Sequence, residues 1–135
     1  MTTDAVPGPR RRRIVLAVLA VVTVGVGLLV HRVVPGEIGD IAGDALYAVL
    51  VFVLVAFILP GCRRSAVAVV AFAVCVAVEL FQLTGLPQEW GAAFPPIGLV
   101  LGSGFDARDI LVYAGGVAAA SLADHAVARS RSTAG

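Results

Sequence analysis

The chain has 135 residues, of which 59% are hydrophobic and 14% are charged, and its formal net charge is +1. A soluble domain is about 45–50% apolar and about 25% charged, so this composition argues against a soluble protein and predicts a membrane protein. The nearly neutral charge provides no basic field for a nucleic acid, and we expect no nucleic-acid partner.

Four long apolar segments follow one another along the chain. Each has close to the 20 or so residues with which a helix crosses a bilayer core about 30 Å thick. Thr23 is the one polar side chain of the first segment, which therefore lacks the polar stripe of a soluble bundle helix. Basic residues precede this segment as in a signal peptide, but no cleavage site follows Val30, and we expect a retained helix. The expected spans are residues 14–30, 41–59, 65–83 and about 107–127.

These spans predict an all-α fold, a bundle of four transmembrane helices within residues 14–127. Polar composition predicts a disordered basic segment at residues 1–13 and a polar tail at residues 128–135. Pro35 and Gly36 break the chain after the first span, so we expect a loop over residues 31–40.

The longest connection, residues 85–105, is too apolar for an ordinary solvated loop and too broken by proline and glycine for a span. We expect an interfacial or re-entrant segment between the third and fourth helices, with Trp90 at the depth of the lipid headgroups.

Arginine placement predicts the orientation of the bundle. Eight of the ten arginines lie in residues 10–13, 63–64 and 129–131, which an even number of spans places on one side. The positive-inside rule puts this side, with both termini, in the cytoplasm. The acids of the two opposite loops then face outward from the plasma membrane. They are Glu37, Asp40, Glu89, Asp106 and Asp109.

Three acids fall within or at the edge of the apolar spans, at a similar depth near the outward side. Each has a polar neighbour three or four residues further along its helix, on the same face. Acids inside a bilayer are costly and usually face the bundle interior. We therefore expect one polar cluster beneath the outward surface, with Arg108 as its cation. Its members are Asp44, Tyr47, Glu79, Gln82, Arg108, Asp109 and Tyr113.

Structural explanations compete with a site at these positions. Asp44 and Asp109 lie in first helical turns, where a carboxylate stabilises the helix N-terminus. Glu79 lies near a helix C-terminus, where the helix dipole disfavours an anion, so we expect it either to carry a proton or to be held ionised by Arg108. Gln82 is typical of polar contacts between helices, and Tyr47 and Tyr113 are typical of membrane-interface anchors.

The fourth span is rich in small residues, which let another helix approach closely. We expect such a contact within the bundle, or with a second copy or a membrane partner. The small residues are Gly115, Gly116, Ala119 and Ala120.

Catalytic and cofactor motifs are absent from the sequence. It contains no phosphate-binding glycine loop, no H-E-x-x-H, no G-x-S-x-G and no metal-ligand spacing of Cys or His. We expect no cofactor and no metal, and an enzyme is the less favoured reading.

Three ordered elements resemble those of a known family. Residues 43–52, beginning Gly43-Asp44, resemble a GDxLWAxxVY element, and residues 79–83 resemble ExxQL. Residues 99–116, with Gly102, Asp109 and Tyr113, resemble LVLGxxFxxxDLxxYxxG. Over about residues 38–123 the chain thus resembles the bacterial domain of unknown function 2809 family, which is distantly similar to VanZ-like proteins.

The resemblance implies a small polytopic membrane protein without an assigned activity. It favours the same residues as a site: Asp44, Glu79, Gln82, Asp109 and Tyr113. Many relatives carry Arg and Thr before the glycine-leucine element, where this chain has Ala92, Phe94, Pro95 and Pro96.

Three function classes remain open on the sequence. The first is a binding or accessory protein whose outward pocket takes a small cationic, polar or lipid headgroup ligand. The second is a small proton-coupled transporter, and the third is a membrane-embedded enzyme that acts on a lipid-linked substrate.

Overall fold

Six α-helices form the described part of the chain, residues 9–102 and 104–133 of a computed structural model, and these residues contain no strand. The prediction of an all-α fold is confirmed. The predicted disorder of residues 1–8 and the last two residues of the predicted tail lie outside the described ranges. The helices are α1 (Pro9–Val33), α2 (Gly36–Ile58), α3 (Arg64–Gln82), α4 (Leu86–Ala93), α5 (Pro95–Leu101) and α6 (Ala107–Ser132).

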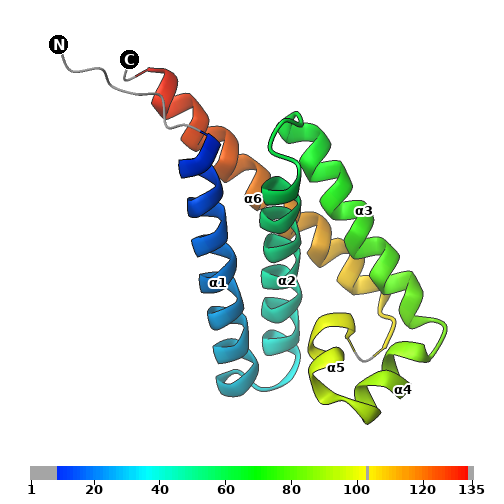
Figure 1. The fold of residues 1–135 in the computed structure, drawn as a ribbon. Helices are drawn as coiled ribbons and strands as arrows, with labels where there is room; N and C mark the ends of the chain where they lie inside the picture. The colour runs from blue at the N-terminus through cyan, green and yellow to red at the C-terminus, as the bar shows by residue number, and fades with distance from the viewer. Residues whose placement is uncertain (1–8, 103, 134–135) are drawn as a thin grey trace.

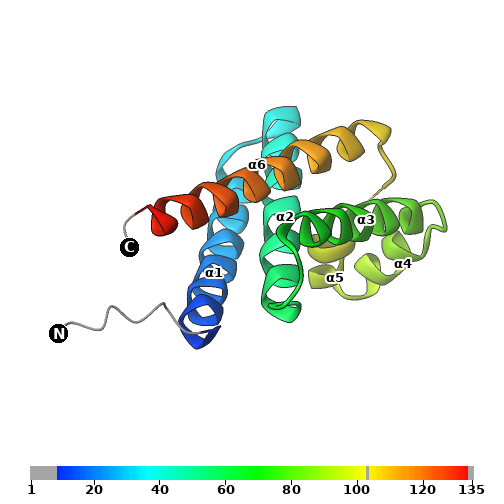
Figure 2. The same ribbon diagram turned by 90° about the horizontal axis from the view of Figure 1, so that it is seen from above.

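Helix α2 is the centre of the bundle (Figures 1 and 2). It packs against α1, α3 and α6, and α6 also packs against α3. Helix α1 packs along α2 alone, and Leu16 is its one buried residue. The core follows from this arrangement, because α2 contributes half of its members: Ala48, Val51, Phe52, Val53, Val55 and Ala56.

Helices α1, α2 and α6 extend further than the apolar segments that predicted them, whereas α3 matches its segment to within one residue at each end. Helix α1 begins at Pro9 rather than at residue 14, and α2 begins at Gly36 within the expected loop. Proline suits the first turn of a helix and arginine is a good helix former, so α1 begins before its apolar segment. For the same reason, α6 continues to Ser132, where no proline or glycine interrupts it. The apolar composition therefore predicts which part of a helix is suited to the membrane, but it does not predict where the helix ends.

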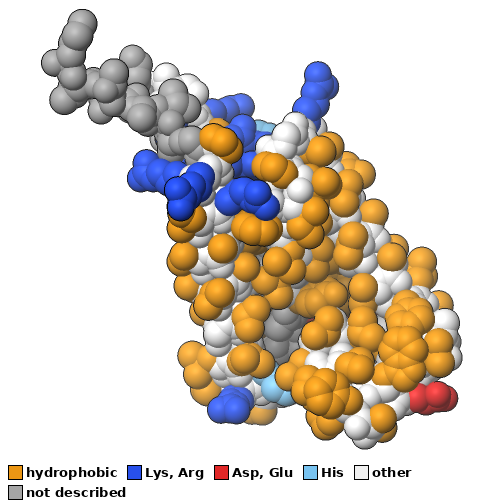
Figure 3. Space-filling view, in the orientation of Figure 1, with side chains coloured by type: hydrophobic (Ala, Val, Ile, Leu, Met, Phe, Trp, Pro, Cys, Tyr) orange, Lys and Arg blue, Asp and Glu red, His pale blue; other side chains and the backbone are white. Residues whose placement is uncertain are grey.

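Four of the helices, α1, α2, α3 and α6, are long and apolar enough to cross a membrane. Their outer faces carry large exposed hydrophobic side chains, including Val21 at 73% and Leu111 at 74% exposure. In Figure 3, hydrophobic side chains cover the flank of the molecule, while arginines gather at the end where α1 begins. An apolar flank between polar ends is the surface that a bilayer requires.

The expected interfacial segment folds into the short helices α4 and α5, which pack against each other beside the end of α3. A Cβ on Gly91 would lie 3.3 Å from the Cα of Gly98, so the two glycines allow this close approach. Trp90 packs against Phe81 of α3 with ring centroids 5.7 Å apart and stays 44% exposed. At seven and eight residues, neither helix is long enough to span a bilayer.

One small residue of α6 explains how closely α2 and α6 approach. A Cβ on Gly116 would lie 2.9 Å from both the Ala45 carbonyl oxygen and the Ala48 Cβ on α2. Gly115 has no atom within 4 Å of the same position. The close helix contact expected at Gly116 therefore lies inside the bundle, while Gly115 faces outward.

Candidate functional site

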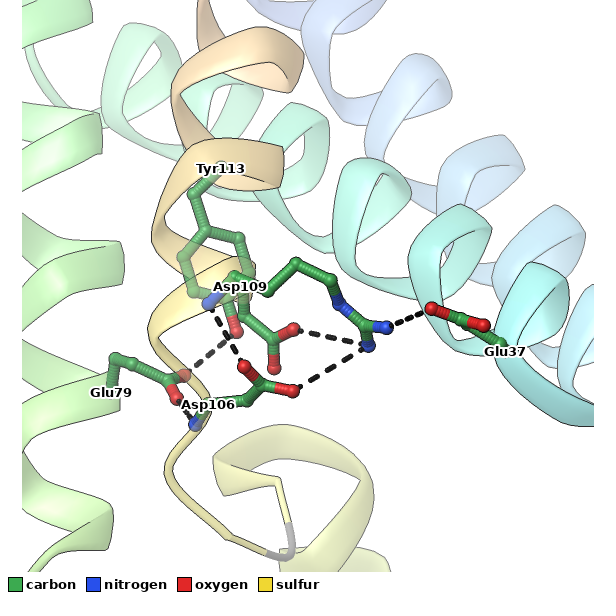
Figure 4. A network of polar contacts seen from close by, with 6 residues as sticks. Glu37, Glu79, Asp106, Asp109 and Tyr113 are labelled. Atoms are coloured by element: carbon green, nitrogen blue, oxygen red, sulfur yellow. Dashed lines mark hydrogen bonds and ion pairs between the residues drawn. The ribbon is translucent and has the colours of Figure 1, made fainter.

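Glu79 is the buried centre of the polar cluster. Its side chain on α3 is 0% exposed. Its Oε1 accepts a hydrogen bond of 2.6 Å from the backbone N–H of Asp106, and its Oε2 accepts one of 3.1 Å from the Tyr113 hydroxyl (Figure 4). These two donors satisfy a carboxyl that would otherwise be costly to bury. They also join α3 to the start of α6.

Arg108 does not pair with Glu79, which corrects one of the two alternatives that the sequence left open for this acid. Its Nη1 lies 2.7 Å from Oε1 of Glu37, and its Nη2 lies 3.7 Å from Asp106 and 3.6 Å from Asp109. The reason is geometric, because Glu37 and Glu79 lie on opposite sides of the start of α6 in Figure 4. Arg108 therefore connects α6 to α2, and hydrogen-bond donors rather than a cation hold Glu79.

Asp44 and Asp109 form an acid pair between α2 and α6. Their carboxyl groups lie close enough to each other to interact electrostatically. The Oδ1 of Asp109 is buried and has no hydrogen-bond partner within the described residues. One turn further into the membrane, the rings of Tyr47 and Tyr113 pack with centroids 6.0 Å apart. The two tyrosine rings therefore lie one helical turn beyond the acid pair.

Gln82 belongs to a separate contact. Its Nε2 donates a hydrogen bond of 2.7 Å to the carbonyl oxygen of Leu101, the last residue of α5. The next residue, Gly102, has φ +74, and a Cβ there would lie 2.5 Å from the same Nε2. Gln82 therefore holds the end of α5 against α3, and Gly102 leaves the space for it.

Two further residues join the cluster that the sequence analysis placed only in outward loops. Glu37 pairs with Arg108, and Asp106 accepts a 2.9 Å hydrogen bond from the Arg108 backbone N–H as the N-cap of α6. The sequence signal for Asp106 was its position just before a helix. No local signal pointed to Glu37, because the pair with Arg108 spans 71 positions.

Asp124 forms a second polar contact, at the arginine-rich end. The sequence analysis did not select it. Its Oδ2 lies 2.8 Å from Nε of Arg64 on α3 and 3.6 Å from Nη2 of Arg12 on α1. The acid therefore joins three helices at the end opposite Glu79.

The polar cluster has an excess of acid. It contains five carboxyl groups, from Glu37, Asp44, Glu79, Asp106 and Asp109, and one guanidinium, that of Arg108, which pairs with three of them. Such a set attracts cations and has no nucleophile-base pair for covalent catalysis. Across the ranges that the structure describes, no three His, Cys, Asp or Glu side chains converge in a way that could hold a metal ion.

A family model described as "Protein of unknown function (DUF2809)" matches residues 33–117, a range that runs from the end of α1 into α6. All seven residues of the sequence-predicted cluster fall in this range. No solved structure matches the chain.

Proposed function

This chain belongs to the DUF2809 family, and from that premise we propose that it is a membrane binding protein whose outward polar cluster takes a small cationic ligand. The ligand class is an ammonium group, either on a free amine or on a lipid headgroup. The acid pair of Asp44 and Asp109 is its contact point, with Tyr47 and Tyr113 beneath it.

The observation that carries this proposal is a buried oxygen of the acid pair that accepts no hydrogen bond. Oδ1 of Asp109 lies near the carboxyl of Asp44 and has no hydrogen-bond partner within the described residues. Nη2 of Arg108 lies 3.6 Å from this oxygen, but the same guanidinium also pairs with Glu37 and Asp106. Two neighbouring carboxylates repel each other unless a cation or a proton lies between them. An ammonium group supplies both the charge and up to three N–H donors.

The same pair supports a proton-coupled carrier as a second candidate. When no ligand is bound, a proton shared by Asp44 and Asp109 removes the repulsion. Entry of a cation would then release that proton, which is the elementary step of coupled exchange. Proton movement driven across a sealed membrane would favour the carrier over the binding protein.

The chain would lie in the plasma membrane of a bacterium, with both termini in the cytoplasm. The arginine distribution supports this orientation, because the eight arginines at the start of α1, around the start of α3 and at the end of α6 lie at one end of the bundle, whereas only Arg32 and Arg108 lie at the other. The acidic cluster would then face outward.

Calorimetric titration of the purified full-length chain with ethanolamine tests the proposal. Binding accompanied by proton release is expected, and both Asp44→Asn and Asp109→Asn should remove it. Asp40→Asn is the matched control, because it deletes one carboxyl from an exposed position of the same helix and should leave binding intact. Equal weakening by all three variants, or equal binding of acetate, would contradict a specific cation site.

Proteoliposomes separate the two candidates. Uptake of labelled ethanolamine that is driven by a pH gradient and lost in Asp109→Asn indicates a carrier. Saturable binding without uptake indicates a binding protein.

A further inference from the structure

A groove of about 430 Å³ lies between the start of α1 and the end of α2, opposite the acidic cluster. This volume falls in the range of about 300–1,000 Å³ that is usual for ligand sites. The groove is lined by Pro9, Arg10, Arg13, Ile14 and Ala17 of α1 and by Phe57 of α2.

The lining residues change from charged to apolar along the groove. Arg10 and Arg13 lie one turn apart on α1, and Ile14 and Ala17 continue the same helix face toward the membrane interior. Phe57 forms the facing wall, and the guanidinium carbon of Arg13 lies 4.8 Å from the centroid of its ring. The groove thus has a cationic mouth and an apolar floor.

Among the described residues, no acid pairs with the two arginines at the mouth of the groove. Asp124 pairs with Arg12 and Arg64, and no ion pair of Arg10 or Arg13 occurs among the residues that the structure describes. Figure 3 shows arginine side chains gathered at this end of the molecule. The mouth therefore has unsatisfied positive charge at the depth where lipid phosphates lie.

We propose that this groove binds one anionic phospholipid of the surrounding bilayer. Arg10 and Arg13 would hold the headgroup phosphate, since guanidinium groups form paired hydrogen bonds with phosphate oxygens. The first part of an acyl chain would lie along Ile14, Ala17 and Phe57. Basic pockets between transmembrane helices are known to bind anionic headgroups in this way.

The site is independent of the outward acidic cluster, because it lies at the other end of the bundle and takes the opposite charge. It also gives α1 a role. That helix packs along α2 and otherwise reaches α6 through the ion pair of Arg12 with Asp124, so a lipid seated between α1 and α2 would add contacts that hold α1 in place.

Native mass spectrometry of the full chain, released from bilayers of equal phosphatidylglycerol and phosphatidylcholine, tests the site. The wild type should retain phosphatidylglycerol preferentially. Arg10→Gln with Arg13→Gln should weaken retention roughly 30-fold, since each arginine near a membrane surface contributes about fivefold. Arg129→Gln with Arg131→Gln removes the same charge outside the groove and should keep most of the affinity.

A second pair of variants leaves the charge unchanged. Ala17→Trp should fill the groove floor and reduce phosphatidylglycerol retention, whereas Leu19→Trp, on the other side of the same helix, should not. This pair decides the question even if the arginine variants do not fold. Equal loss in both arginine pairs would show general surface attraction and overturn the proposal. Equal retention of phosphatidylcholine, or displacement of the lipid by inorganic phosphate alone, would overturn it as well.

Discussion

The backbone N–H of Asp106 donates a 2.6 Å hydrogen bond to Oε1 of Glu79, so a buried carboxyl on α3 holds the residue that begins α6. The side chain of Asp106 in turn caps α6 by accepting a hydrogen bond from the Arg108 backbone. One residue therefore connects the buried half of the cluster to the ion pairs at its edge.

The hydrogen bond from Tyr113 to Glu79 leads to the first prediction. Tyr113→Phe removes the hydroxyl donor and leaves a buried oxygen of Glu79 without a partner. The free energy of unfolding should fall by about 1–3 kcal/mol, the usual cost of an unsatisfied buried polar group. Thermal or denaturant unfolding in detergent measures the loss.

Tyr47→Phe is the control for this change. It removes the same hydroxyl from the neighbouring ring, for which no hydrogen bond appears within the described residues, and the ring pair remains. Its stability should change by less than about 0.5 kcal/mol, as for a substitution that breaks no contact. Equal losses for the two tyrosines would argue against the Glu79 hydrogen bond.

Two adjacent glycines of α6 should respond in opposite directions. Gly116→Ala places a Cβ 2.9 Å from Ala45 and Ala48, so α2 and α6 must move apart. We expect destabilisation of about 1–3 kcal/mol, which is typical of overpacking. Gly115→Ala meets no atom within 4 Å and should stabilise the helix by up to about 1 kcal/mol, because alanine is the better helix former. A lower melting temperature in both variants would contradict the close contact between Gly116 and α2.

Gly102 should tolerate no side chain. Its φ of +74 and ψ of 179 belong to a region open almost only to glycine. Gly102→Ala should cost about 1–3 kcal/mol in backbone strain and push Gln82 away from the Leu101 carbonyl. Limited proteolysis of the connection between α5 and α6 should become faster. A Cβ on Gly104 would lie 3.8 Å from Nε2 of Gln88, an ordinary contact distance, so Gly104→Ala should leave the cleavage rate unchanged. Faster cleavage in both variants would point to a general loosening of the loop.

The orientation of the bundle is tested by cysteine labelling in intact cells. On a background with Cys62→Ala and Cys75→Ala, Glu89→Cys in α4 should react with an impermeant maleimide from outside. Ser130→Cys near the end of α6 should react only after the cells are opened. Labelling of the second position in intact cells would reverse the proposed topology.

The acids within the apolar spans could be predicted from the sequence as cluster residues, but the part played by Glu37 and Asp106 and the pairing of the side chains could not. Acids in apolar helices are rare enough to stand out one by one, which is why Asp44, Glu79 and Asp109 were found. Their partners depend on helix rotation and on the path of the connection before α6. The backbone N–H of Asp106 is a donor that no side-chain pattern reveals. Arg108 pairs with Glu37, which lies on the opposite side of the start of α6 from Glu79 (Figure 4).

The amino-acid sequence by itself determined the environment and the architecture. Four segments of sufficient length and apolarity must form helices in a bilayer, since no water is present to satisfy their backbone groups. The tertiary structure alone decided which polar groups meet. Helix packing set Gly116 against α2, brought Asp44 near Asp109, and placed Arg13 of α1 over the ring of Phe57 on α2. These contacts join positions far apart in the chain, and their geometry follows from close packing between helices rather than from any local pattern.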